Sequence, residues 1–410
     1  MATPHTSTRQ LAIAGGTPVR TRPFQGWPIW DEREEQALLR ALRSGEWGVG
    51  GQETEQFEQE FAQAIGSRFA LSVTNGTHAL VAALRAAGVT YGDEVIVPPY
   101  TFVATATAVL LVGALPVFAD IDIETGCLDP AAVEAAITPR TKVIMPVQLA
   151  GYPADMDRLG EIAARHGLTL IEDACQAHGA QWRGKAVGSI GAMGCFSFQS
   201  SKNINAGEGG AITTDDPQLF ERAWSYKNCG RTREGGLWYQ HDYLGDNYRL
   251  SQFQAAVLRA QLTRMEEWAQ RRAENGEYLL AGLRAIGGLV PQRADERVTR
   301  HGFHFILTRY QPEAFGGMSR DRFIEALRAE GIPASRGYIP LYTTGAVRDT
   351  ERALRQALGL GEPTPPHCPA TERLCNEEAV WLVGQSALLG TRADMDDILE
   401  AVAKIRAAQQ

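Results

Sequence analysis

One lysine, Lys202, stands in the polar segment 197–203, and the glycine-rich turn 207–210 follows it. The segment opens with Ser197, and Asp173 closes an apolar stretch upstream. A lysine amine forms a Schiff base with an aldehyde, a hydroxyl can bind a phosphate, and a carboxylate can pair with a protonated ring nitrogen. Pyridoxal 5'-phosphate requires these three groups. The pattern therefore predicts a site for that cofactor.

Asp173 ends a strand-like segment, where an unpaired carboxylate would be costly to bury. A protonated pyridine nitrogen would supply the compensating charge, and the ring could then accept electrons when a substrate α-proton leaves. Gln176 and His178 follow on the same turn, and either could bond the phenolic oxygen of the cofactor. Gln176 is the stronger candidate, because a histidine in such a position is more often structural.

Two further turns could contact the same cofactor. Residues 74–78 lie between a predicted strand and a predicted helix, so that their N–H groups face the positive end of the helix dipole. Gly76 and Thr77 are the candidate phosphate ligands there. At the end of the next strand, the ring of Phe102 could stack on a pyridine ring. Alone, such a turn is usually only a connection and such an aromatic usually belongs to the core.

Short β-branched segments alternate with helical patterns between residues 70 and 172. We expect strands at 70–73, 94–97, 116–119, 142–147 and 169–172, with helices at 78–87, 104–111, 130–137 and 155–166. Repeated strand–helix units predict an α/β fold with a mainly parallel central sheet flanked by helices. Ligands bind such sheets at the carboxyl ends of the strands, where Asn75, Tyr100 and Asp173 fall.

Helical spacing also predicts elements on either side of this region. We expect helices at 31–44, 54–65, 251–286, 320–329 and 392–407, a strand at 303–308 and a structured proline-rich connection at 338–369. Gly287 and Gly288 interrupt the helical pattern. We therefore predict an N-terminal arm at 1–30, a large cofactor-binding α/β domain at 31–286 and a smaller C-terminal α+β domain at 287–410.

The composition narrows the classes of partner. The 410 residues include 40 basic and 48 acidic ones, for a formal net charge of -8, and the charges are scattered. Neither nucleic acid nor an anionic membrane is therefore an expected partner. Segment 1–10 lacks the apolar core of a secretion signal, and no apolar run could span a bilayer, which favours a cytoplasmic location. The six cysteines form no C-x-x-C pair, so we expect free thiols and no metal site.

Taken in order, these motifs resemble those of the DegT/StrS family of pyridoxal-phosphate-dependent sugar aminotransferases over nearly the whole chain. The matching segments are 76–77, 172–180, 197–210 and 245–262. The resemblance implies the fold-type I aminotransferase architecture. It also implies that Lys202 forms the Schiff base, that Asp173 binds the pyridine nitrogen and that Ser197 binds the phosphate.

The resemblance extends to assembly and substrate. It implies that Asn247 reaches the phosphate of the neighbouring subunit, so that a homodimer completes each site. Family members with histidine at the lysine position act as sugar dehydratases, and Lys202 excludes that activity. Segments 74–80, 141–147 and 154–157 are similar to scyllo-inosose aminotransferases and aminohydroxybenzoate synthases. We expect transfer of an amino group from L-glutamate or L-glutamine to a keto-cyclitol or a keto-sugar. A nucleotide-linked keto-sugar is an alternative acceptor.

Other functions fit part of the same pattern. Elimination or aldol cleavage would use the same cofactor, but an amino donor would not convert it to its amine form. A non-catalytic protein would bind the cofactor without turnover. A nucleotide-binding protein is disfavoured, because the turn at 74–78 matches neither the G-x-G-x-x-G motif nor a P-loop. The polar loop residues that we expect near the entrance are Arg231, His241, Arg336 and Tyr338.

Overall fold

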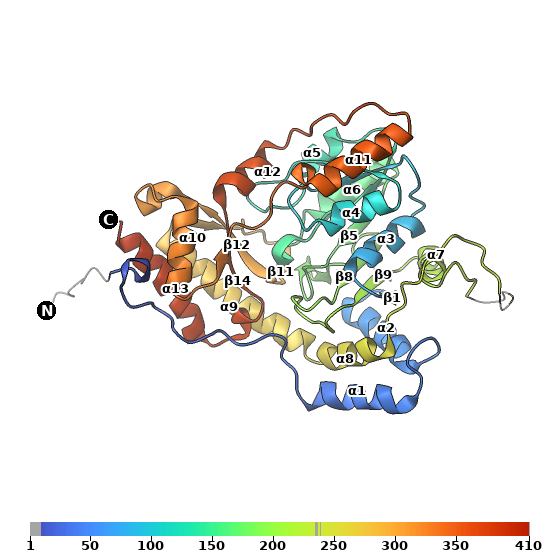
Figure 1. The fold of residues 1–410 in the computed structure, drawn as a ribbon, viewed down its shortest axis with the longest axis horizontal. Helices are drawn as coiled ribbons and strands as arrows, with labels where there is room; N and C mark the ends of the chain where they lie inside the picture. Colours follow the sequence, from blue (N-terminus) through green and yellow to red (C-terminus); the bar gives the residue numbers. More distant parts are fainter. Residues whose placement is uncertain (1–9, 234–236, 238, 410) are drawn as a thin grey trace.

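A seven-stranded sheet forms the centre of the molecule (Figure 1). The structure is a computed structural model that describes residues 10–233, 237 and 239–409. The strand order is β1-β9-β8-β5-β4-β2-β3. Neighbouring strands from β8 to β3 are parallel, whereas β9 is antiparallel to both β1 and β8. The predicted mainly parallel α/β sheet is confirmed.

The strands of this sheet are short and mostly buried, as is typical of a parallel sheet that is covered on both faces. They are β1 (Phe69–Val73), β2 (Glu94–Val97), β3 (Leu115–Phe118), β4 (Thr141–Ile144), β5 (Thr169–Asp173), β8 (Met193–Ser197) and β9 (Gly210–Thr214). The first five coincide with predicted strands to within a few residues. The sequence analysis did not predict β8 and β9, which flank the loop that carries Lys202.

The helices that pack around the sheet are α2 (Gln52–Ile65), α3 (Gly76–Ala86), α4 (Ala104–Leu111), α5 (Pro130–Ala135), α6 (Met156–His166) and α7 (Pro217–Lys227). α1 (Glu32–Ser44) instead packs against the helix at 252–262. α3 is buried over most of its length because its sequence is apolar on nearly every face. Its first residue follows Asn75, whose side-chain oxygen accepts a hydrogen bond from the backbone N–H of His78 at 2.9 Å. This cap fixes where the helix begins.

The predicted single helix at 251–286 is wrong, because the chain forms two helices there. They are α8 (Gln252–Leu262) and α9 (Met265–Ile286). At the break, the hydroxyl of Thr263 donates to the carbonyl of Ala260 at 2.7 Å. The next residue, Arg264, pairs with the buried carboxylate of Glu34 in α1. These side-chain bonds compete with the helical backbone pattern, and apolar periodicity does not report them.

A second sheet lies in the C-terminal part of the chain, which is the part from β10 onward. It is antiparallel and has the order β10-β12-β14-β13. Its strands are β10 (Leu289–Pro291), β12 (Phe305–Tyr310), β13 (Ala334–Ser335) and β14 (Ala379–Gly384). α10 (Arg320–Ala329) and α13 (Arg392–Ala407) have the predicted bounds and share an apolar core with this sheet. The proline-rich connection contains α11 (Gly345–Ala357) and is followed by α12 (Pro369–Arg373), and neither helix was predicted.

The N-terminal segment runs beside the C-terminal part before it reaches α1 (Figure 1). Leu11, Ile13, Val19 and Phe24 pack against the apolar core that the second sheet shares with α10 and α13. The predicted division into an arm and two domains stays a prediction. Within the described part of the chain, no helix is long and apolar enough to cross a membrane. The same residues contain no His, Cys, Asp and Glu cluster suited to a metal ion.

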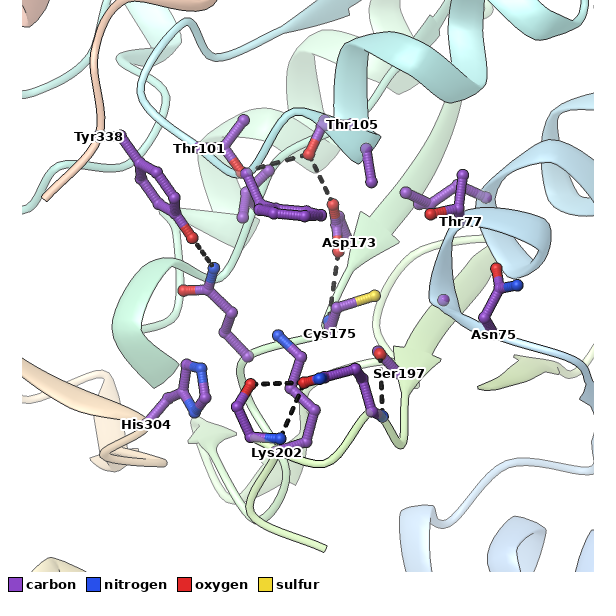
Figure 2. Close-up of a pocket in the computed structure, with 18 of the residues that line it drawn as sticks. Asn75, Thr77, Thr101, Thr105, Asp173, Cys175, Ser197, Lys202, His304 and Tyr338 are labelled. Carbon is purple, nitrogen blue, oxygen red and sulfur yellow. Dashed lines mark hydrogen bonds between the residues drawn. The ribbon is translucent and has the colours of Figure 1, made fainter. Parts of the chain in front are cut away.

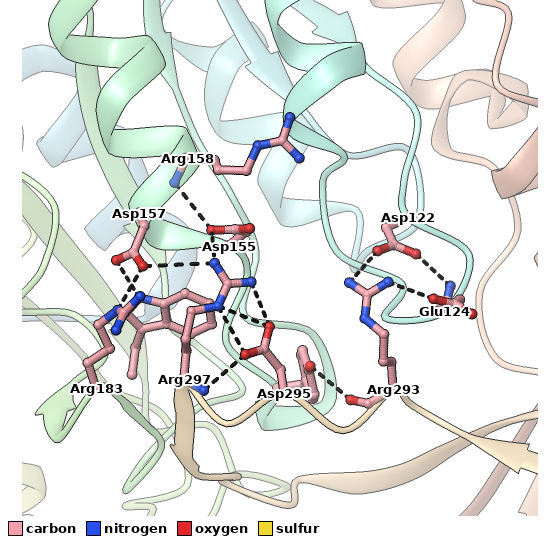
Figure 3. A network of polar contacts seen from close by, with 11 residues as sticks. Asp122, Glu124, Asp155, Asp157, Arg158, Arg183, Arg293, Asp295 and Arg297 are labelled. Carbon is pink, nitrogen blue, oxygen red and sulfur yellow. Dashed lines mark hydrogen bonds and ion pairs between the residues drawn. The ribbon is translucent and has the colours of Figure 1, made fainter.

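A network of charged side chains ties the loop after β10 to the large sheet (Figure 3). The guanidinium of Arg297 lies 2.6 Å from Asp295 and 3.1 Å from Asp155, which caps α6. It also stacks over the ring of Trp182, 4.6 Å from the ring centre. The small sheet behind the network consists of β11 (Val298–Arg300), β6 (Gln181–Trp182) and β7 (Lys185–Ala186).

We expect Arg297→Gln to lower the free energy of unfolding by about 1–2 kcal/mol at pH 7. The hydrogen bond from Arg297 lowers the pKa of the Asp295 carboxyl. A lowered folded-state pKa stabilises the protein above the unfolded pKa of about 3.9 and ceases to do so as the pH falls through the folded pKa. The difference between variant and wild type should therefore shrink below about pH 4.

Urea unfolding at several pH values measures this difference. The matched control is Arg158→Gln, since the Arg158 side chain is exposed and forms no ion pair with a described residue. A difference between Arg297→Gln and wild type that stayed constant down to pH 3 would contradict the assignment of Asp295 as the titrating partner.

Candidate active site

A cavity of about 820 Å³ lies at the carboxyl ends of the parallel strands (Figure 2). Its walls come from the turns that follow β1, β2, β4, β5 and β8. This is the edge at which parallel α/β sheets bind ligands. Seven of the eight predicted site residues line the cavity: Gly76, Thr77, Phe102, Asp173, Gln176, Ser197 and Lys202.

One end of the cavity has the hydrogen-bond donors that an anion requires. Gly76 and Thr77 are the first residues of α3, so their N–H groups have no partner within the helix. Ser197, at the end of β8, lies directly against this turn. A Cβ atom on Gly76 would be 2.6 Å from the Cβ of Ser197. Only glycine therefore allows the helix N-terminus and the serine hydroxyl to lie together at one end of the cavity.

Lys202 lies on the loop between β8 and β9, which are adjacent in the sheet. Its backbone N–H donates to the carbonyl of Gln199 at 2.8 Å, within a turn of the loop. Burial lowers the pKa of the Lys202 amine, although nearby Cys175 and Asp173 oppose the shift. A lowered pKa increases the fraction of neutral amine, which is the nucleophilic form.

The residue after the lysine anchors this loop to the rest of the molecule. The Asn203 side chain donates to the carbonyl of Gly302 at 2.7 Å, and its backbone carbonyl accepts a hydrogen bond from Arg272 at 3.1 Å. Arg272 is buried, and its guanidinium lies over the rings of Trp27 and Trp268. The C-terminal part and α9 therefore both fix the position of the lysine loop.

Asp173 lies at the base of the cavity and is only 4% exposed. One carboxylate oxygen accepts from the Thr105 hydroxyl at 2.8 Å, and the other accepts from the Cys175 N–H at 3.2 Å. The Thr101 hydroxyl lies 3.2 Å from that of Thr105. Among the described residues, no lysine or arginine forms an ion pair with Asp173. This buried carboxylate is therefore oriented by its neighbours and can accept a cationic N–H group.

Gln176 and His178 occupy different environments. The Gln176 side chain lines the cavity, where its oxygen accepts from the Ala150 N–H and its nitrogen donates to the Tyr338 hydroxyl, each at 2.9 Å. His178 is buried beside the rings of Phe196 and Phe198 and does not line the cavity. Burial, followed by the influence of Lys202 and of a buried arginine, lowers the pKa of His178 to about 3, so it is neutral at pH 7.

The remaining predicted residues are divided between the cavity and the surface. The Phe102 ring lines the cavity but is 55% exposed. Asn247 is exposed and lies outside this cavity. Among the four loop residues expected at the entrance, Tyr338 alone lines the cavity. Arg336 instead pairs with Asp321 at 2.6 Å, and Arg231 forms a backbone bridge with His241.

Several lining residues were not predicted. Thr105, His304, Phe305 and Trp381 line the cavity. Thr105 follows Thr101 by one helical turn, and that spacing was a usable signal for a hydrogen-bonded pair. Phe305 lies in β12, His304 directly precedes that strand, and Trp381 lies in β14. These three residues reach the cavity only because the C-terminal part packs against the large sheet.

We expect Gly76→Ala to lower the free energy of unfolding by about 1–3 kcal/mol, because the new methyl group would overlap Ser197. The matched control is Gly160→Ala within α6, where a Cβ meets nothing within 4 Å. That control should raise the free energy of unfolding by about 0.5–1 kcal/mol, since alanine favours helix interiors. Urea unfolding of both variants measures the contrast, and equal effects would contradict the close contact at Gly76.

The chain is similar to known proteins over nearly its whole length. The model of the DegT/DnrJ/EryC1/StrS aminotransferase family matches residues 28–402. A relative from Streptoalloteichus tenebrarius, provisionally named L-glutamine:3-amino-2,3-dideoxy-scyllo-inosose aminotransferase, is 44% identical over 97% of this chain and 98% of its own. The L-glutamine:2-deoxy-scyllo-inosose aminotransferase of the same organism is 41% identical over 96% of this chain and 97% of its own.

The fold is also shared with a solved structure. The crystal structure of 3-amino-5-hydroxybenzoic acid synthase matches with a TM-score of 0.85 and 40% sequence identity, and the match covers 94% of this chain and 99% of that one. The predicted fold-type I aminotransferase architecture is confirmed. The chain is an aminotransferase that belongs to the DegT/DnrJ/EryC1/StrS family.

Proposed function

We propose that this aminotransferase uses pyridoxal 5'-phosphate to transfer an amino group from L-glutamine to a keto-cyclitol. The observation that carries the proposal is the convergence of Lys202, Asp173 and Ser197 on one cavity, together with the N-terminus of α3. A cavity of about 820 Å³ lies within the size range of sites that bind a cofactor or small ligand.

The residues present fit this cofactor. Asp173 is buried without a cationic partner among the described residues, so a protonated pyridine nitrogen would balance its charge. The phosphate would bind at the N–H groups of Gly76 and Thr77 and at the Ser197 hydroxyl. The Lys202 amine would hold the aldehyde. When bound, the cofactor supplies an electron sink for the carbanion that forms beside the transferred nitrogen.

The chain's own residues would divide the remaining tasks. After the donor displaces it, the Lys202 amine would take the proton from the donor α-carbon and would deliver it to the C4′ carbon of the cofactor. Burial favours the neutral amine needed for this role. Asp173 would keep the ring nitrogen protonated, while Thr105 and the Cys175 N–H hold its carboxylate in place. A second substrate would then accept the amino group by the reverse sequence.

The charges around the cavity favour a keto-cyclitol over a nucleotide-linked sugar. Among the described residues that line it, Lys202 is the single lysine and none is arginine. The pyrophosphate of a nucleotide-linked sugar is bound most strongly by cationic groups, and the described lining residues of this chain supply none besides Lys202. The keto-cyclitol 2-deoxy-scyllo-inosose is uncharged, and hydroxyl groups such as those of Thr101 and Tyr338 can bond its oxygens. The names of the two Streptoalloteichus tenebrarius relatives support both this acceptor class and L-glutamine as the donor.

A homodimer would complete each site. The described lining residues provide no cation at the phosphate end, and Asn247 is exposed outside the cavity of its own chain. The side chains of Trp30, Trp47 and Val49, which flank α1, are 66%, 53% and 71% exposed. Large exposed apolar side chains are typical of contact surfaces where they gather on one face. These observations support a dimer in which Asn247 binds the partner's phosphate. The cytoplasmic location stays a prediction.

Addition of pyridoxal 5'-phosphate should give the purified protein a visible absorbance band, and L-glutamine should bleach that band as the cofactor takes the amino group. Lys202→Ala should show no such donor-dependent change. Lys185→Ala, at an exposed lysine in β7, should behave like the wild type. If neither L-glutamine nor L-glutamate bleached the wild-type band, the aminotransferase half-reaction would be overturned. Elimination, aldol cleavage or simple binding would then be favoured.

Mixed dimers test the shared site. Lys202→Ala removes the amine, and Asn247→Asp places a negative charge against the phosphate, so each variant alone should be inactive. Co-expression should restore about one quarter of the wild-type activity, because about half of the dimers are mixed and each mixed dimer has one intact site. Activity is measured as amino transfer to 2-deoxy-scyllo-inosose. No recovery would show that Asn247 serves its own chain.

A further inference from the structure

Tyr338 brings a hydroxyl group into the cavity from the C-terminal part of the chain. It precedes a short 3-10 helix, Leu341–Thr343, and lines the cavity. Figure 2 shows it on the side of the pocket opposite Asn75 and Thr77. It therefore lies away from the end of the cavity assigned above to the phosphate.

A directional chain of hydrogen bonds ends at this hydroxyl. The backbone N–H of Ala150 can only donate, so it fixes the Gln176 oxygen as its acceptor, at 2.9 Å. The Gln176 amide nitrogen must then face Tyr338, and it donates to the phenolic oxygen at 2.9 Å. A hydroxyl that accepts one hydrogen bond still carries its own proton. Tyr338 therefore has a proton left to donate.

Nothing in the described part of the chain accepts that proton. The one hydrogen bond of the Tyr338 side chain is the bond that it accepts from Gln176. Burial raises the pKa of Tyr338, so the hydroxyl stays protonated at neutral pH. An O–H donor that is held at the wall of a ligand cavity without an acceptor can be satisfied by the ligand.

The ring is locked in this orientation before any ligand arrives. Gly337 has a φ of +81°, and a Cβ there would lie 2.4 Å from the Trp381 indole nitrogen, so only glycine allows this approach. The Tyr338 ring makes edge-on contacts with Tyr100 and Trp381, at centroid distances of 5.7 and 4.5 Å. The Trp381 indole N–H donates to the Tyr100 hydroxyl at 2.8 Å and fixes those two rings.

We propose that Tyr338 donates a hydrogen bond to a hydroxyl or carbonyl oxygen of the keto-cyclitol, and that it thereby determines acceptor recognition. This inference rests on the proposed function. A neutral O–H group suits a neutral, oxygen-rich acceptor, whereas a donor carboxylate is bound more strongly by a cationic group. The second amide proton of Gln176 remains for the cofactor, so the two residues would serve different oxygens.

Tyr338→Phe removes only the hydroxyl and should reduce kcat/KM for 2-deoxy-scyllo-inosose about tenfold. The single-turnover rate of bleaching by L-glutamine should stay within about twofold of the wild type, because Tyr338 would not contact the donor. The matched control is Tyr342→Phe, which removes a hydroxyl on the same segment. That hydroxyl bonds Glu372 at 3.0 Å and lies outside the cavity, so both half-reactions should be unchanged.

Two results would overturn the proposal. Equal losses in both half-reactions would show that Tyr338 acts on the cofactor through Gln176, and unchanged acceptor kinetics would show that its hydroxyl contacts no acceptor oxygen. Gln176 and the cavity would keep their assignments in either case.

A binding measurement separates this proposal from the proposed function. Calorimetric titration of 2-deoxy-scyllo-inosose into cofactor-loaded Lys202→Ala requires no turnover, and adding Tyr338→Phe should weaken binding about tenfold. Equal affinities would overturn the role of Tyr338, whereas no binding by the Lys202→Ala chain itself would overturn the keto-cyclitol acceptor and, with it, the role of Tyr338. Failure of L-glutamine to bleach the wild type would overturn the proposed function instead.

Discussion

The arrangement of the site depends on one buried carboxylate without a cationic partner among the described residues. Asp173 closes β5, and hydrogen bonds from Thr105 and from the Cys175 N–H hold its two oxygens. A charge in this position is costly unless a cation pairs with it. The sheet therefore provides a strong reason to bind a positively charged ring, and Lys202 and the α3 N-terminus are arranged around that position. The cofactor assignment follows from this electrostatic requirement as much as from the lysine.

Strained backbone connects the sheet to the C-terminal part at the same place. Ala150 and Phe303 have φ values of +61° and +47°, which residues other than glycine rarely adopt. The N–H of His304 donates to the carbonyl of Ala150 at 2.8 Å, and the N–H of Ala150 bonds Gln176. Such strain costs about 1–3 kcal/mol per residue and persists where the surrounding structure fixes it. Here Ala150 bonds the side chain of Gln176, and Phe303 precedes His304. Both of these side chains line the cavity.

Sequence patterns predicted most of the sheet and the residues on its edge. β-branched runs and helical periodicity located β1 to β5, because burial on the two faces of a sheet imposes those patterns. Gly76 and Asp173 could be selected because they lie at the ends of predicted strands, and Ser197 and Lys202 because they share one polar segment that precedes a glycine-rich turn. β8 and β9 were missed, since the polar lysine loop between them hides the strand pattern.

The unpredicted half of the site depends on contacts between distant segments. Thr105 is an ordinary helix residue until its hydroxyl meets Asp173, which lies 68 positions away in sequence. Trp381 gains its role only when the second sheet packs beside the first, and the same packing gives Tyr338, which was expected only near the entrance, its place in the cavity wall. No local propensity encodes such a meeting, and the break between α8 and α9 was missed for the same reason, because Arg264 finds Glu34 across the fold.

The two walls of the cavity thus have separate origins, and this separation bears on how the enzyme can change. The groups assigned to the cofactor lie on strand ends of the large sheet, whereas His304, Tyr338 and Trp381 belong to the C-terminal part. Substitutions in the latter wall can alter substrate choice while the cofactor groups stay in place. Evolution of new specificities, or exchange of segments between relatives in the laboratory, could therefore begin in the C-terminal part.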